Sequence, residues 1–97
     1  MMKIKLATVM TDLFGKPIKN GEVDFLLSDV CMNALLSPDD EKEADEKVKR
    51  YRLAVKCSNG ADPDLSVEEV ALLKKLIGRV YPPLIVGKAY DLIDPPA

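Results

Sequence analysis

Residues 66–81, SVEEVALLKKLIGRVY, combine a helix start with an unusually wide apolar surface. Ser66 and Glu69 have the spacing of a capping box, in which each side chain satisfies a free backbone N–H at the start of the helix. At about 100° per residue, the apolar side chains cover roughly 260°, whereas a surface helix needs a stripe little more than about 100° wide. The sequence therefore predicts a central core helix. Lys74 projects from inside the apolar arc, which leaves open that part of the arc is an interface.

The last helix, predicted for residues 84–93, is also apolar over most of its circumference, with Lys88 and Asp91 as its only charges. Pro82 and Pro83 must end the preceding helix, and Pro83 suits the first turn of the next one. Gly87 is predicted to allow close packing between helices. Two such helices in succession exceed what a small core can cover, and large uncovered apolar patches commonly mark interfaces. We therefore expect a subunit interface built from Lys74, Leu84, Ile85, Tyr90 and Leu53.

The middle of the chain predicts a short helix over residues 29–36, capped by Ser28, and a long helix from Ser37 to about Cys57. Ser37 is a suitable N-cap, and Pro38 suits the first helical position. The long helix carries acids early and bases late, which favours oppositely charged pairs four residues apart. These predicted pairs are Glu43–Lys47, Asp45–Lys49 and Glu46–Arg50.

Two separate apolar patches occur on this long helix. One is a tight stripe made of Ala44, Val48, Tyr51 and Val55, while Leu53 and Cys57 project from nearly the opposite side. A helix with two apolar sides needs two partners. The second contact is predicted to be either the terminal helix or another subunit.

Residues 2–26 are predicted to form a β-hairpin or small meander. Polar and apolar residues alternate from Lys3 onward, and Asn20-Gly21 is a strong signal for a tight turn between strands. Such a unit is marginal alone and must pack on the helices. We therefore expect an α+β fold in one domain, residues 1–97, with an N-terminal β-hairpin (2–26) packed on a bundle of about four helices (28–93).

The composition excludes several functional classes. At 47% hydrophobic and 31% charged residues, the chain is expected to be a globular protein rather than a disordered one. It contains no histidine and no glycine-rich phosphate loop, and its two cysteines lie 26 residues apart, from Cys31 to Cys57. We expect no enzymatic activity, no cofactor and no metal. Since no apolar run reaches the length of a membrane span or a signal peptide core, the expected location is the cytoplasm.

A nucleic-acid-associated regulator is the alternative function. Lys49, Arg52 and Lys56 share one face of the long helix and could contact phosphates. The net charge of -2 argues against a general nucleic-acid binder, and a solvated face with pairs inside the helix is the simpler interpretation.

Three segments together resemble a set of short, uncharacterised proteins of tailed bacteriophages and prophages. They are TVMTDLFGKPI near the start, EKVKRYRLAVK in the long helix, and LSVEEVALLKKLIGRVYPPLIVGKAYDLI at the end. The resemblance covers about half of the chain and implies a phage or prophage origin and a bacterial cytoplasm; it carries over no catalytic or binding residue. We therefore expect a small accessory protein that acts through protein–protein contacts with phage or host proteins. We also expect a homo-oligomer, most simply a symmetric dimer through the last two helices. Roles in assembly, in regulation and in inhibition of a host enzyme remain open.

Overall fold

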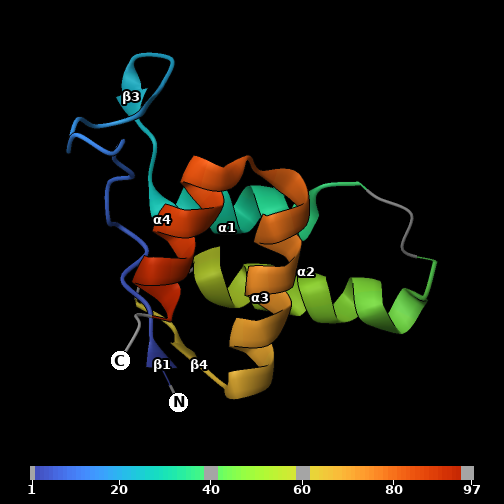
Figure 1. Cartoon of the computed structure of the whole chain (residues 1–97). Coiled ribbons are helices and arrows are strands. Elements are labelled where there is room, and N and C mark those ends of the chain that lie inside the picture. The colour runs from blue at the N-terminus through green and yellow to red at the C-terminus, as the bar shows by residue number, and fades with distance from the viewer. Residues whose placement is uncertain (1, 39–41, 59–61, 95–97) are drawn as a thin grey trace.

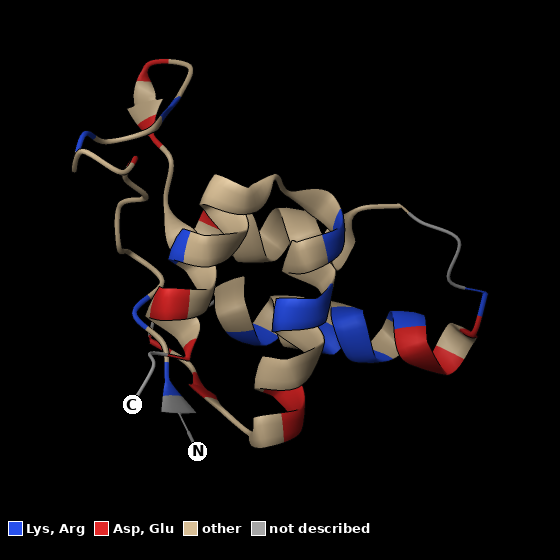
Figure 2. Ribbon diagram, viewed as in Figure 1, with Lys and Arg blue, Asp and Glu red and all other residues tan. Residues whose placement is uncertain are grey.

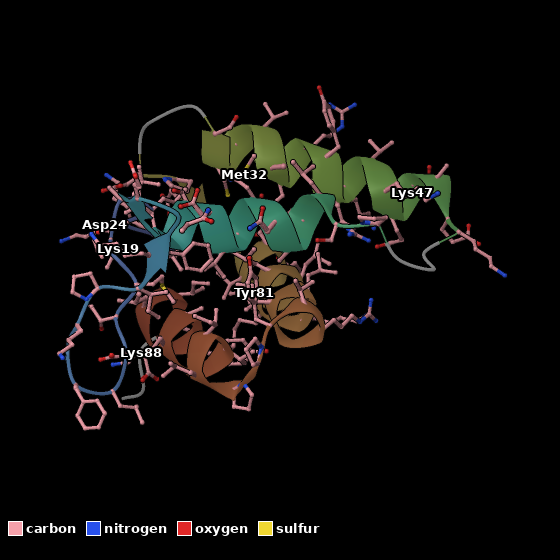
Figure 3. All side chains as sticks on the ribbon, turned by 90° about the horizontal axis from the view of Figure 1, so that it is seen from above. Lys19, Asp24, Met32, Lys47, Tyr81 and Lys88 are labelled. Carbon is pink, nitrogen blue, oxygen red and sulfur yellow. The ribbon has the colours of Figure 1, made fainter. Side chains whose placement is uncertain are left out.

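The computed structural model describes residues 2–38, 42–58 and 62–94, and it has the expected α+β fold with an N-terminal hairpin followed by four helices. The helix bounds are α1 Leu27–Leu36, α2 Ala44–Ser58, α3 Val67–Val80 and α4 Pro83–Ile93. The strand bounds are β1 Met2–Lys3, β2 Lys19–Asn20, β3 Val23–Asp24 and β4 Asp64–Leu65. α1 lies between α2 on one side and α3 with α4 on the other, as Figure 3 shows from above.

The predicted tight turn joins β2 and β3, where Gly21 adopts a φ of 70°. The first strand does not belong to this hairpin, however. β1 pairs in antiparallel fashion with β4, a short strand that the sequence did not predict, and the two lie side by side in Figure 1. The chain near Met10 runs beside the segment that leads into α1. The hydrogen bond from Met10 N to Phe25 O, at 2.8 Å, links the two segments.

α1 is the central helix of the fold, and its buried residues are Leu27, Val30, Cys31, Ala34 and Leu35. The helix begins earlier than predicted, and Ser28 is not its cap. The Asp29 carboxylate accepts a hydrogen bond from Leu26 N at 2.9 Å instead.

The start of the long helix is corrected. α2 begins at Ala44, and Ser37 closes α1, where its N–H donates to Asn33 O at 3.0 Å. Ser37 has an extended backbone, with φ −66° and ψ 136°, as expected for a residue that precedes a proline. The acids predicted for the first turn after Pro38 lie at positions 39–41, outside the described residues.

The start of α3 confirms the capping box. Ser66 Oγ accepts from Glu69 N at 3.2 Å, and Glu69 Oε1 accepts from Ser66 N at 2.9 Å. The buried side of α3 is narrower than the apolar arc of its sequence and consists of Val70, Leu73, Leu76 and Ile77. Pro83 starts α4 as predicted.

Close helix packing occurs at Gly78 rather than at Gly87. A Cβ at position 78 would stand 2.9 Å from Tyr90 Oη, whereas a Cβ at position 87 would meet nothing within 4 Å.

Candidate interaction surface

An apolar stripe on α2 faces away from the rest of the molecule. Val48, Tyr51 and Val55 are 44%, 61% and 49% exposed, and Ala44 is exposed as well. These four residues, here called the α2 stripe, follow the helical repeat and share one side of the helix. In Figure 3, α2 forms one edge of the molecule, so no other described element covers this side.

The opposite side of α2 is the one that packs on α1. Its buried residues are Arg50, Leu53, Ala54 and Cys57. Both apolar sides of this helix are predicted from the sequence, with Leu53 on the less regular side assigned to the expected interface, and that assignment is wrong. The structure places the less regular side in the core and leaves the more regular stripe on the surface.

Arg50 explains why α2 is turned this way. Its side chain is 7% exposed, and it donates from Nε to Leu35 O at 3.1 Å and from Nη2 to Ser37 O at 2.9 Å. The last carbonyls of a helix have no partner inside the helix, and a cation near this end also meets the negative end of the helix dipole. Arg50 therefore ties α2 to the end of α1, a role that differs from the predicted pairing with Glu46.

The exposed apolar surface continues from the α2 stripe onto the end of α1. Leu36 is 55% exposed, and it lines one shallow hollow of about 300 Å³ together with Tyr51 and Pro38. We call the α2 stripe together with Leu36 and Pro38 the α2 face. It is a continuous surface from two helices, which single exposed apolar residues are not.

The residues predicted for a subunit interface are mostly used inside the chain. Leu53 and Ile85 are 3% and 9% exposed and belong to the core, so neither contributes a free surface. Lys74 Nζ pairs with Asp94 Oδ2 at 3.1 Å and lies 5.0 Å from the centre of the Tyr90 ring.

Tyr90 Oη donates to the Lys74 carbonyl at 2.6 Å, so Tyr90 and Lys74 hold α4 against α3. Leu84 is half-buried. Part of the apolar surface of the last two helices is thus used inside the chain, between α3 and α4 and between α3 and α1, while Val67, Val80 and Leu92 stay 73%, 42% and 38% exposed.

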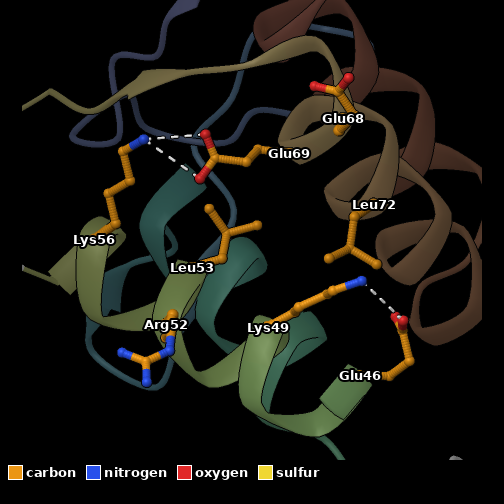
Figure 4. A pocket seen from close by; sticks show the side chains of 8 residues that line it. All are labelled: Glu46, Lys49, Arg52, Leu53, Lys56, Glu68, Glu69 and Leu72. Carbon is orange, nitrogen blue, oxygen red and sulfur yellow. Dashed lines mark hydrogen bonds and ion pairs between the residues drawn. The ribbon is translucent and has the colours of Figure 1, made fainter.

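The three bases of the nucleic-acid alternative come together in one groove between α2 and α3, shown in Figure 4. The groove holds about 530 Å³ and is lined by Glu46, Lys49, Arg52, Leu53, Lys56, Glu68, Glu69 and Leu72. Its three cations are therefore matched by three carboxylates.

Two of these cations are engaged by the groove's own acids. Lys49 Nζ lies 3.1 Å from Glu46 Oε1, which replaces the predicted Asp45–Lys49 pair. Lys56 Nζ lies 3.0 Å from Glu69 Oε1 and spans the groove from α2 to α3. Only Arg52 is left without an ion pair to another described residue.

The ionisation of Glu69 reflects these contacts. Burial alone would raise the pKa of its carboxyl group. The hydrogen bond from the Ser66 N–H and the nearby Lys56 ammonium outweigh burial and hold the pKa below its ordinary value. Glu69 thus serves both the helix cap and the contact between α2 and α3.

A second exposed apolar pair lies on the turn over residues 11–17. Leu13 and Phe14 are 78% and 88% exposed. The turn that presents them is well organised, since Asp12 Oδ1 accepts from Phe14 N at 2.8 Å and from Lys16 N at 3.1 Å. This turn and the outer end of α2 lie on opposite sides of the molecule in Figure 1.

The two cysteines are buried thiols, and burial raises the pKa of both, that of Cys31 to about 12. Within residues 2–38, 42–58 and 62–94, no three Cys, Asp or Glu side chains are grouped as a metal site would require. No helix in the described part of the chain is long and apolar enough to cross a membrane.

Comparison of the chain with protein families, with curated proteins and with solved structures finds no match in any of the three. The surfaces described above are therefore the basis for assigning a function to this chain.

Proposed function

We propose that this chain is a small, non-enzymatic interaction protein that acts through protein–protein contacts and self-associates through its α2 face. Following the resemblance noted in the sequence, the proposed setting is an accessory protein of a phage or prophage in the bacterial cytoplasm. The observation that carries the proposal is the α2 stripe, in which Val48, Tyr51 and Val55 are each between 44% and 61% exposed.

An apolar surface of this kind lowers the stability of the free chain when it stays in contact with water. Burial of apolar surface stabilises a protein by about 25 cal/mol for each Å² removed from water. A stripe that stays exposed along several helical turns lacks this stabilisation over its whole length. Scattered exposed apolar residues are normal, but a continuous patch commonly marks a contact site. A partner that covers the α2 face would recover this free energy.

The Leu13–Phe14 turn gives the proposal a second contact point. It lies far from the outer end of α2 (Figure 1), so a partner bound there would not compete with one on the α2 face. We propose that the α2 face serves self-association and that this turn serves contact with another phage or host protein.

The nucleic-acid alternative has weaker support. Lys49 and Lys56 would have to give up their pairs with Glu46 and Glu69 before they could contact phosphates. Three acids in the same groove would also repel a polyanion. Arg52 alone would give only weak electrostatic attraction to the phosphates of a nucleic acid.

Sedimentation equilibrium tests the proposal. The wild-type chain, studied from about 5 to about 200 µM, should associate reversibly, since contacts of modest area commonly have micromolar affinity. Tyr51→Asp should weaken this association strongly. Val67→Asp is the matched control, because Val67 is 73% exposed at the start of α3 and lies outside the α2 face.

The same protein is then titrated with a labelled oligonucleotide at about 50 and about 200 mM salt. Binding to the oligonucleotide that falls steeply with salt, combined with a monomeric protein, would replace our proposal by the alternative. A monomer that also fails to bind would contradict both.

A further inference from the structure

The charges beside the α2 stripe are arranged asymmetrically along the helix. Asp45 and Arg52 are both exposed, and neither forms a hydrogen bond or ion pair with another described residue. They are seven residues apart, so at 100° per residue they lie on nearly the same side of α2, along one edge of the stripe. Figure 2 shows the outer end of α2 carrying acidic residues and its middle carrying basic ones.

This arrangement is self-complementary in only one orientation. If two α2 helices pack stripe to stripe in opposite directions, a two-fold axis passes between them near Val48. The axis then brings Asp45 of each copy opposite Arg52 of the other, on the same edge of the contact. In a parallel two-fold dimer, the edge that carries Asp45 and Arg52 lies on opposite sides of the contact in the two copies, so neither residue would meet its counterpart or form an intersubunit pair.

We propose that the occupant of the α2 face is a second copy of this chain, packed with antiparallel α2 helices and held in register by two reciprocal Asp45–Arg52 pairs. This inference deepens, and rests on, the proposed self-association. The antiparallel arrangement also opposes the two helix dipoles, and it places the apolar stripes in contact along their length.

The size of the surface indicates a weak dimer. α2 has 15 residues and is about 22 Å long, so two crossed copies make a contact at the lower end of stable interfaces. Leu36, Pro38 and Tyr51 form the apolar part of one hollow beside the stripe, which Lys47 and Arg50 also line, and this apolar part can receive apolar side chains of the other copy.

Charge reversal tests the register. Asp45→Arg and Arg52→Asp are made singly and together, and the fold of each variant is checked by circular dichroism. Each single variant should self-associate at least about tenfold more weakly than wild type, because two repulsive contacts replace two attractive ones. A mixture of the two single variants should recover association, since each heterodimer again has two opposite-charge contacts.

The double variant tests the reciprocal pairing. In the antiparallel dimer, the doubly reversed chain associates with itself as well as wild type does, because both opposite-charge contacts are restored, whereas a parallel dimer should be indifferent to the single and the double changes alike. A double variant that stays as weak as the single variants overturns the antiparallel register. A wild-type dimer that is indifferent to both single changes overturns the inference but leaves self-association intact. A wild-type monomer at high concentration contradicts both.

Discussion

Tyr90 Oη lies where it would come within 2.9 Å of a side-chain carbon at position 78, so α3 and α4 approach closely only because residue 78 is glycine. The hydroxyl group is fixed there, since it donates to the Lys74 carbonyl at 2.6 Å. A helical glycine is otherwise unfavourable by about 1 kcal/mol relative to alanine. The contact explains its presence in the middle of α3.

Gly78→Ala should therefore behave differently from Gly87→Ala. At position 87 the added methyl group meets open space, and better helix propensity should stabilise the protein by up to about 1 kcal/mol. At position 78 the same gain is opposed by a clash that typically costs about 1–3 kcal/mol. In urea unfolding, Gly78→Ala should therefore be less stable than Gly87→Ala by the cost of the clash, about 1–3 kcal/mol.

A double-variant cycle checks the cause of this difference. In a Tyr90→Phe background the opposing oxygen is absent, so Gly78→Ala should become neutral or stabilising. A loss of the same size in both backgrounds would mean that Tyr90 is not responsible.

Arg50→Met should destabilise the fold by about 2–3 kcal/mol, although it retains most of the apolar stem. The substitution removes the two hydrogen bonds to Leu35 O and Ser37 O and leaves these carbonyls at a partly buried helix end. Arg79→Met, at an exposed position of α3, is the control and should stay within about 0.5 kcal/mol of wild type. Equal stability of the two variants would refute the anchoring role of Arg50.

Alkaline pH should weaken the fold through Cys31. Burial raises the pKa of this thiol from 9.0 to about 12 in the folded chain, whereas the unfolded chain releases the proton near the ordinary value. The contribution of the protonated Cys31 thiol to the stability of the fold is thus complete below pH 9 and is lost as pH rises from 9 towards 12. Between about pH 8 and 10, wild type should lose about 1 kcal/mol more stability than Cys31→Ala. Parallel pH profiles for the two proteins would show that Cys31 does not titrate in this way.

Acidic pH should act through Glu69. Because the pKa of its carboxyl group is lowered in the folded state, its contribution is present above pH 4.5 and is lost as pH falls through the lowered value. Below pH 5, the free energy of unfolding of Glu69→Gln should fall less with decreasing pH than that of wild type. The difference should be only a few tenths of a kcal/mol, because Glu69 and Lys56 are partly exposed. A steeper profile for the variant would contradict the assignment. Thermal unfolding measured between about pH 3 and 6 makes the comparison.

The features that the sequence predicts correctly are those set by neighbouring residues. The Ser66–Glu69 capping box, the Asn20-Gly21 turn and the start of α4 at Pro83 depend on local geometry, and each occurs as predicted. The pairing of β1 with β4 joins segments about sixty residues apart, and no local sequence pattern predicts it.

The orientation of α2 was harder to predict for a different reason. Its exposed stripe has the more regular apolar spacing, while its buried side includes Arg50, a residue type that is seldom buried. Only the position of the α1 carbonyls reveals why an arginine belongs there. Leu53 and Ile85 were predicted to lie in an interface, but both are buried in the core. An apolar side chain in a sequence does not reveal which neighbour covers it.

The most direct test of the account is a dilution series followed by amide chemical shifts of the ¹⁵N-labelled chain. Self-association through the α2 face predicts concentration-dependent shifts centred on Val48, Tyr51 and Val55 and extending to Leu36, with α4 unaffected. Shifts centred on Leu84 and Tyr90 instead would place the contact on the last two helices. A spectrum that does not change with concentration would contradict self-association through α2.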